Sequence, residues 1–364
     1  MSDLFEINRL AGMELANRFV RSATWEGMAD EKGAVTDQLI EYYARLAKGG
    51  VGLIIASHAY VTIQGKAGLG QLGIYDDSLA PGYERLTKAV HENKGKVAAQ
   101  LAHAGFLANT ELSGLPAVAP SATAQGYNRK VEALTVSDIA RLTRDFALAA
   151  QRAKDAGFDG VQIHAAHTYL LSQFLSPFFN RRTDIYGGGI EQRARMLLEV
   201  YEAVRKQVGE DYPVLVKINS GDFLDGGLSE AHSLVACRLL SQAGVDAIEM
   251  SGGNLLDPKF RPARPGKITP QTEAYYRNQA KAVRAQISCP LILVGGIRSL
   301  DVARQLFDEK TCDYISLSRP LIREPDLIKR WQKGDTRPAE CLSDNLCYKP
   351  IYAGKGVSCP HLEK

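Results

Sequence analysis

The stretch Pro213-Val-Leu-Val-Lys-Ile218 is a short run of mostly apolar, partly β-branched residues. A continuous apolar run of this length predicts a strand that is covered on both faces, as in a parallel sheet. Similar runs recur along the whole chain and are separated by amphipathic stretches with helical spacing. We predict eight strands, at residues 18–22, 51–56, 96–101, 160–164, 213–218, 246–250, 290–294 and 313–317.

A predicted helix follows each predicted strand. The helices are expected at residues 37–48, 80–93, 137–156, 190–208, 229–243, 272–286, 300–308 and 326–332. Thr135 and Ser229 stand where N-caps are expected, and Gly157 and Gly244 stand where helices end. Eight alternating strands and helices are the signature of a (β/α)8 TIM barrel in the α/β class. The alternative is a doubly wound sheet, which would need fewer strands and a switch in strand order.

The length of 364 residues would by itself suggest two or three domains, at roughly 150 residues each. A barrel with long loops accounts for this length as one unit, because such barrels range from about 200 to more than 400 residues. We therefore expect a barrel at residues 1–335 and a tail at residues 336–364 that packs on the barrel or on a neighbouring subunit. A homo-oligomer is compatible with this arrangement.

The composition is that of an ordinary globular protein, with 45% hydrophobic and 23% charged residues. The net charge of +3 is small and dispersed, so we expect a small-molecule partner rather than a nucleic acid. The first residues are acidic where a secretory signal carries Lys or Arg, and no apolar run approaches the roughly 20 residues of a membrane span. We expect a cytoplasmic protein without a membrane segment.

Six cysteines form no C-x-x-C pair, and a disulfide framework is not expected in a long chain of this kind. Cys341, Cys347, Cys359 and His361 stand near the C-terminus, with five and eleven residues between successive cysteines. These spacings match no structural zinc site. We therefore expect free thiols and no bound metal.

The segment His164-Ala-Ala-His167-Thr-Tyr169 follows the fourth predicted strand, at the face where barrel active sites are built. Two imidazole N–H groups aimed at one point polarise a carbonyl or hold a phenolate, and a phenol beside them can donate a proton. The alternatives are a metal site, although no carboxylate ligand stands beside the histidines, and histidines that only satisfy backbone groups.

Two segments favour a phosphate site. Val294-Gly-Gly296 follows the seventh strand and Ser318-Arg319 follows the eighth, in the loops that commonly bind phosphate in this fold. Glycine lets backbone N–H groups approach an anion closely, and Arg319 would add a charged contact; glycines that serve tight turns alone are the alternative. The G-x-G-x-x-G pattern at residues 68–73 does not open a helix, so we do not expect it to bind a dinucleotide.

Two polar residues interrupt otherwise apolar strands, Gln100 in the third and Lys217 in the fifth. A buried lysine is costly unless an anion lies beside it. Lys217 therefore indicates a bound group that is or becomes anionic, or else a pair with a barrel carboxylate such as Glu249.

Two connections are too long for ordinary loops, at residues 102–134 and 252–271. Both leave the C-terminal ends of strands, where long loops usually cover an active site, although an oligomer contact is the alternative. The second connection carries Lys259, Arg261, Arg264 and Lys267.

Five stretches add a family resemblance. They are Asn17 to Thr24, Gln100 to Gly105, Ala156 to Pro177, Asn180 to Gly188 and Ser316 to Asp326. In these stretches, over nearly the whole chain, the sequence resembles the old yellow enzyme family of FMN-dependent ene-reductases, close to its bacterial NADH:flavin oxidoreductase branch. The resemblance implies non-covalent FMN, a ping-pong cycle with NADH or NADPH as reductant, and reduction of the activated C=C bond of an α,β-unsaturated carbonyl compound.

The same resemblance implies roles for twelve residues. The flavin would be contacted by Ala23, Thr24, Trp25, Ser57, Gln100 and Lys217, and its phosphate would be held by Gly296, Ser318 and Arg319. His164 and His167 would bind the carbonyl oxygen of the substrate, and Tyr169 would donate the proton.

The sequence departs from the family pattern at several positions. Lys217 replaces an Arg found in many members, Trp25 is bulky, and Gly27 stands where some relatives place a substrate-contacting Tyr. Larger relatives place four cysteines for an iron–sulfur cluster after the barrel, but Asp344 breaks that series, so no cluster is expected. The alternative functions are an FMN barrel that acts on dienoyl thioesters or amines, and a non-catalytic barrel that binds a phosphate ligand.

Overall fold

The computed structural model describes residues 3–122, 129–266 and 268–363. Eight parallel strands form a closed barrel in the order β3-β4-β5-β8-β9-β10-β11-β12, and β12 pairs with β3 to close it. The strands are β3 (Phe19–Arg21), β4 (Leu53–Tyr60), β5 (Val97–Ala102), β8 (Gly160–Ala165), β9 (Val214–Asn219), β10 (Ala247–Ser251), β11 (Leu291–Val294) and β12 (Tyr314–Leu317). The prediction of a (β/α)8 barrel is confirmed, and closure excludes the doubly wound alternative.

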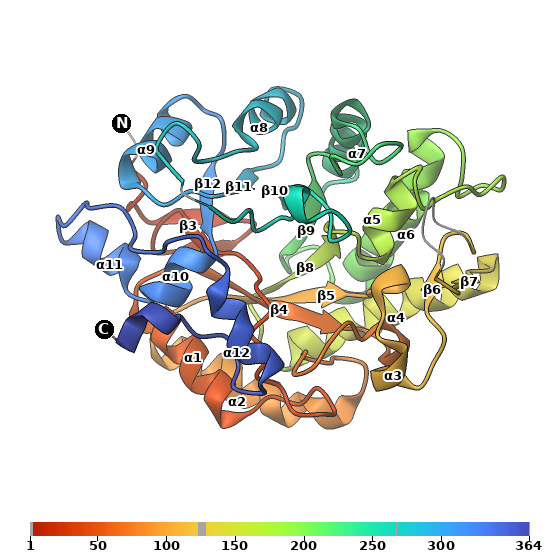
Figure 1. Ribbon diagram of the computed structural model, residues 1–364, viewed down its shortest axis with the longest axis horizontal. Coiled ribbons are helices and arrows are strands. Elements are labelled where there is room, and N and C mark those ends of the chain that lie inside the picture. The colour runs from red at the N-terminus through yellow and green to blue at the C-terminus, as the bar shows by residue number, and fades with distance from the viewer. Residues whose placement is uncertain (1–2, 123–128, 267, 364) are drawn as a thin grey trace.

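Helices surround the strands on the outside of the barrel (Figure 1). The main ones are α1 (Asp37–Lys48), α2 (Ala80–Glu92), α4 (Val136–Asp155), α6 (Ile190–Val208), α7 (Glu230–Gln242), α8 (Arg277–Arg284), α9 (Leu300–Asp308) and α11 (Leu327–Gln332). Thr135 begins α4 with a capping box that it forms with Asp138, which satisfies backbone N–H groups at the helix start. Within the described residues, no helix combines the length and the apolar character that a membrane crossing requires.

Helix α8 is shorter than the predicted helix at residues 272–286, and the expected start was wrong. The carboxylate of Glu273 accepts hydrogen bonds from the backbone N–H groups of Arg298 (2.8 Å) and Ser299 (3.0 Å), before α9. Ala274 has a positive φ of 50°, which interrupts a helical backbone. The residues before α8 therefore serve the neighbouring loop instead of extending the helix.

Several short elements lie in the connections and were not predicted. They are α3 (Thr110–Ser113), β6 (Val118–Ala119) and β7 (Glu132–Ala133) in the loop at residues 102–134, α5 (Leu170–Leu175) after β8, α10 (Arg319–Arg323) after β12, and α12 (Lys349–Tyr352) in the tail. Residues 123–128 of the first long loop and Lys267 of the second lie outside the described residues.

A hairpin closes the N-terminal end of the barrel. Its strands β1 (Asn8–Leu10) and β2 (Met13–Leu15) pair antiparallel. Leu10, Met13 and Leu15 are buried and belong to one apolar cluster with residues of the barrel interior such as Val20 and Leu215. These side chains fill this end of the barrel, and ligand sites in this fold lie at the opposite, C-terminal end.

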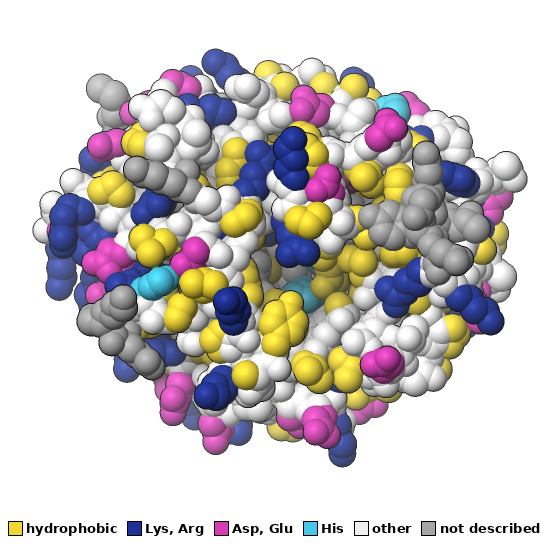
Figure 2. Space-filling model, in the orientation of Figure 1, with side chains coloured by type: hydrophobic (Ala, Val, Ile, Leu, Met, Phe, Trp, Pro, Cys, Tyr) yellow, Lys and Arg dark blue, Asp and Glu magenta, His cyan; other side chains and the backbone are white. Residues whose placement is uncertain are grey.

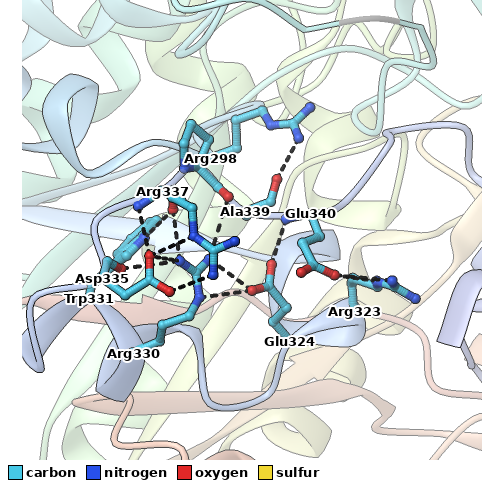
Figure 3. Close-up of polar contacts among 10 residues, drawn as sticks. Arg298, Arg323, Glu324, Arg330, Trp331, Asp335, Arg337, Ala339 and Glu340 are labelled. Carbon is cyan, nitrogen blue, oxygen red and sulfur yellow. Dashed lines mark hydrogen bonds and ion pairs between the residues drawn. The ribbon is translucent and has the colours of Figure 1, made fainter.

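The chain after α11 is anchored by a polar network (Figure 3). Arg330 pairs with Glu324 (2.8 Å) and Asp335 (3.2 Å), and Arg323 pairs with Glu340 (3.1 Å). The backbone N–H of Glu340 also donates to Glu324 Oε2 (2.5 Å). These contacts fix the point from which the tail runs toward the C-terminal face of the barrel.

Candidate active site

A cavity of about 620 Å³ opens at the C-terminal ends of the strands. Figure 2 shows a hollow near the middle of one face, with a histidine side chain inside it and Lys and Arg side chains around it. Eleven of the twelve residues that the family resemblance singled out line the cavity. They are Ala23, Thr24, Trp25, Gln100, His164, His167, Tyr169, Lys217, Gly296, Ser318 and Arg319.

Ser57 is the exception, and its neighbour His58 lines the cavity instead. The backbone N–H of Ser57 donates to the hydroxyl of Tyr43 (2.8 Å), while its own hydroxyl is buried. Strand β4 contains an irregularity here, because Ile55 pairs with Ala98 but His58 pairs with Gln100. One extra residue in β4 changes which side chains face the cavity, as a β-bulge does.

The rings of three residues from the end of β8 lie together in the cavity. The ring centroids of His164 and His167 are 5.4 Å apart, and those of His164 and Tyr169 are 4.6 Å apart. His58 packs edge-on against Tyr169 at 5.3 Å. The arrangement brings two imidazoles and one phenol together in the cavity, where their position after the fourth predicted strand led us to expect them.

The backbone that carries His167 is strained. His167 and Thr168 both have positive φ, 58° and 65°, which is costly for side chains of these types. Asn219 Oδ1 accepts a hydrogen bond from the His167 backbone N–H (3.1 Å), and Ser251 Oγ lies 2.7 Å from His167 Nε2. Sequence reasoning missed Asn219 and Ser251, although each is a polar residue at the end of a predicted strand.

Burial sets the protonation of these groups. It lowers the pKa of both His164 and His167 well below the usual value, and the positive charge of Lys217 lowers both further. Burial raises the pKa of the Tyr169 hydroxyl. Near neutral pH the imidazoles are therefore uncharged hydrogen-bond donors, and the phenol keeps its proton.

Beneath the cavity lies a group of paired polar side chains, which we call the floor cluster. It consists of Ser22, Gln162, Lys217, Glu249 and Ser316. Lys217 Nζ lies 3.3 Å from Glu249 Oε2 and donates to Ser22 Oγ (2.7 Å). Glu249 also accepts from Ser22 Oγ (2.7 Å), Gln162 Nε2 (2.9 Å) and Ser316 Oγ (2.8 Å).

The sequence suggested either a bound anionic group or a pair with Glu249 as the partner of Lys217, and the floor cluster is compatible with both. Lys217 pairs with Glu249 and at the same time lines the cavity. Burial lowers the pKa of Lys217, while the charge of Glu249 raises it. Gln100 enters the same network, because its Nε2 donates to Gln162 Oε1 (2.6 Å). A cationic side chain and an amide are thus held in fixed positions at the base of the cavity.

Another part of the cavity is suited to phosphate. Gly296 has a φ of 74°, and an added Cβ would lie 2.5 Å from the ring of Tyr275. Arg319 donates through Nη1 to Ser343 O (3.2 Å) and Asn345 Oδ1 (2.8 Å). The hydrogen bonds that Arg319 donates to described residues all use Nη1, which leaves Nε and Nη2 for an anion.

The tail forms one wall of the cavity, through Tyr348, Lys349 and Tyr352 among others. An added Cβ at Gly27 would lie 2.2 Å from Ile351 Cγ2, so the tail occupies the space of a side chain at position 27. The ring of Tyr352 packs edge-on against Trp25, with centroids 5.7 Å apart. At Trp25 and Gly27, where the sequence departs from the family pattern, residues of the tail therefore pack against the unusual side chain or fill the space of the missing one.

The cysteines of the tail carry no metal-binding arrangement in the part of the chain that is described. Burial raises the pKa of the Cys347 thiol, and the nearby Cys341 and Cys359 raise it further. Asp344 Oδ2 is 2.7 Å from His361 Nε2. No group of three or more His, Cys, Asp or Glu side chains among the described residues is placed to hold a metal ion.

The cavity fits a flavin mononucleotide. His164 lines the cavity, and its buried Nδ1 has no hydrogen-bond partner within the described residues, which leaves a polar atom for a ligand to satisfy. Lys217 and Gln100 offer a cation and an amide to a polar ring edge, and the cradle at Gly296 and Arg319 offers donors to a phosphate.

The profile described as the NADH:flavin oxidoreductase / NADH oxidase family matches residues 3–337. The metal reductase of Desulforamulus reducens is 38% identical over an alignment of 364 positions that covers 99% of this chain and 53% of that protein. The chain thus spans about half the length of this curated relative.

Two solved structures share the whole fold. The old yellow enzyme homologue from Zymomonas mobilis has a TM-score of 0.82 and is 28% identical, over 99% of this chain and 98% of that chain. A complex of 2-naphthoyl-CoA reductase with 2-naphthoyl-CoA has a TM-score of 0.89 and is 27% identical, over 98% of this chain and 56% of that chain.

Proposed function

Because the chain belongs to the NADH:flavin oxidoreductase / NADH oxidase family, which includes the old yellow enzymes, we propose that it reduces activated C=C bonds. The reductant is NADH or NADPH, the cofactor is FMN, and the substrate is an α,β-unsaturated carbonyl compound. One observation carries this proposal: His164, His167 and Tyr169 converge in a cavity whose base holds Lys217.

The protein residues bind and polarise the carbonyl group. His164 and His167 are neutral and donate hydrogen bonds to the carbonyl oxygen, which draws electron density away from Cβ. Ser251 and Asn219 fix the ring and backbone of His167, so that its donor does not have to reorganise during the reaction. FMN, when bound, supplies the hydride that Cβ accepts.

Tyr169 completes the addition by donating the proton to Cα. Its raised pKa keeps the proton available throughout the neutral range. The ring of His58 packs against Tyr169 and holds the phenol beside the histidines. The chain also orients the cofactor, with Gln100 and Lys217 at the flavin ring and Gly296, Ser318 and Arg319 at the phosphate.

The first experiment is the spectrum of the purified protein. We expect a yellow protein whose flavin is bleached by NADH or NADPH and restored by cyclohexenone. A colourless protein that fails to bind added FMN would contradict the proposal. A para-substituted phenol should produce a long-wavelength charge-transfer band that His164→Ala weakens, and an unchanged band in both His164→Ala and His167→Ala would reject the carbonyl pocket.

A second candidate is the reduction of an unsaturated acyl thioester. It is favoured by the likeness to the structure that contains 2-naphthoyl-CoA. Steady-state turnover of cyclohexenone and of a dienoyl-CoA under the same conditions separates the two candidates. A protein that binds FMN but oxidises neither NADH nor NADPH would instead support a non-catalytic role.

A further inference from the structure

We propose that Arg261 and Lys349 form an anion-binding subsite at the mouth of the cavity, for a carboxylate or phosphate group carried by a reactant. This inference rests on the proposed function, because it concerns the reactants of the same site. We call Arg261 and Lys349 the rim pair. Both line the cavity, although one belongs to the loop after β10 and the other begins α12 of the tail.

The first support is the sign of the charges around the cavity. Its lining contains four cationic side chains, those of Lys217, Arg261, Arg319 and Lys349. None of the described lining residues is Asp or Glu. A cleft lined by one sign of charge concentrates ions of the opposite sign and speeds their entry.

The second support is that Arg261 and Lys349, unlike the other cations of the site, are free to bind an anion carried by a reactant. Lys217 is paired with Glu249, and Arg319 is held by the tail beside the phosphate cradle. The nearby Arg264 is also engaged, because its guanidinium lies 4.4 Å from the centroid of the Tyr275 ring. Arg261 and Lys349 are solvent-exposed, and no ion pair joins either of them to a described acidic residue.

The third support is their position relative to the histidines. His164 is buried and His167 is half-buried, whereas both members of the rim pair are exposed. A reactant whose reacting part meets the histidines extends outward past the rim. Two reactants could carry the anion there: the dinucleotide, through the ribose phosphate that NADPH has and NADH lacks, or the oxidant, through a carboxylate remote from its C=C bond.

The test uses the FMN-loaded protein and measures each half-reaction separately by stopped-flow. One arm compares NADPH with NADH as reductant. The other compares para-carboxybenzalacetone with its methyl ester as oxidant. The variants are Arg261→Gln and Lys349→Gln, with two matched controls that do not line the cavity: Lys259→Gln on the same loop and Lys355→Gln in the same tail.

We expect each rim variant to raise the half-saturation concentration of at least one anionic reactant by about threefold to fivefold, the size of one exposed ion pair. The neutral ester or NADH should change little, and both controls should resemble the natural protein. A selective effect in the first arm assigns the anion to the dinucleotide, and in the second arm to the oxidant.

Equal behaviour of the rim and control variants would overturn the inference. So would equal changes for NADPH and NADH together with equal changes for the carboxylate and its methyl ester. The proposed function has separate failures, because it fails if FMN does not bind, if neither dinucleotide reduces it, or if neither cyclohexenone nor the ester reoxidises it. A protein that passes those tests while the rim variants have no selective effect retains the function and loses the subsite.

Discussion

The floor cluster and the rim pair hold their charges in opposite ways. At the floor, Lys217 and Glu249 are buried, 3.3 Å apart, and bonded to uncharged side chains on several strands. At the rim, Arg261 and Lys349 are exposed and have no counter-charge among the described acidic residues. Both regions line or support the same cavity.

The difference shows what each region can do. A buried pair keeps its geometry because leaving either charge alone is costly, so it presents a constant charge to the cavity. An exposed cation moves freely, gains little from a single contact and is screened by salt. The floor is therefore suited to chemistry that needs fixed positions, and the rim to the capture of different charged reactants.

Breaking the floor pair should have the largest effect. Glu249→Gln leaves Lys217 buried without a counter-charge, and we expect a loss of about 3–5 kcal/mol in the free energy of unfolding. Urea denaturation with saturating FMN measures it. The double variant Lys217→Met/Glu249→Gln should recover part of this loss. As a control, Asp37→Asn breaks the exposed pair with Arg85 and should cost under about 1 kcal/mol of unfolding free energy. If Glu249→Gln and Asp37→Asn lost the same stability, the buried floor pair would not differ from an exposed pair.

The buried rings above the floor should give the next largest effect. Tyr169→Phe removes the proton donor, and we expect reoxidation of the reduced protein by cyclohexenone to slow by about 10² or more. The rate of reduction by NADH should be almost unchanged. Stopped-flow absorbance follows both steps. An equal slowing of the two steps would mean that Tyr169 shapes the site rather than donates the proton.

A smaller effect should appear in the dependence of stability on pH. Burial, with the charge of Lys217, lowers the pKa of His58 to about 4, whereas an unfolded histidine titrates near 6.5. Between these values the unfolded chain binds a proton that the folded chain does not, so stability falls as pH decreases from about 6.5 to about 4.

The variant His58→Asn isolates this contribution. Its stability should depend less steeply on pH over that interval, by up to about 1.4 kcal/mol per pH unit. Urea midpoints at several pH values provide the comparison. Parallel curves for the natural protein and the variant would show that His58 is accessible to protons in the folded state, and would place it with the rim rather than the floor.

The smallest expected effect is that of salt. Raising the ionic strength from about 0.05 M to about 0.5 M shortens the screening length severalfold. We expect the half-saturation concentration of an anionic reactant bound at the rim to rise by about threefold, whereas the rate constant for a neutral enone, which depends on the floor, stays constant. A similar salt response in Arg261→Gln/Lys349→Gln would assign the effect to other charges.

The strands of the barrel could be predicted because burial on both faces makes them continuous apolar runs. The same reasoning placed α1, α6 and α9 at their observed bounds, since their apolar spacing and end signals agree. It failed at the start of α8, where Glu273 bonds to the backbone before α9. Such a contact joins residues of different loops and leaves no periodic trace in the sequence.

The candidate site was predictable where position along the chain determines position in space. His164, His167 and Tyr169 stand at the end of one strand, where the chain leaves the barrel, so the predicted fold placed them together at its mouth. Ser57 and His58 differ because the irregularity in β4 depends on its pairing with β5, which the sequence does not display. The pairing of Lys217 with Glu249 follows from adjacent strands in register, and the sequence could suggest it as one of two alternatives.

Ile351 packs against Gly27, so a helix of the tail lies beside the cavity. Residues far apart in the sequence therefore control the chemistry and the entrance. The groups proposed for the chemistry stand on the barrel strands, whereas part of the entrance is built from a short helix in the tail. Changes in that helix could alter which molecules enter without altering how they react. We therefore expect substitutions at Tyr352, which lines the cavity, to adjust selectivity independently of the chemistry, provided that position 27 remains glycine and leaves room for Ile351.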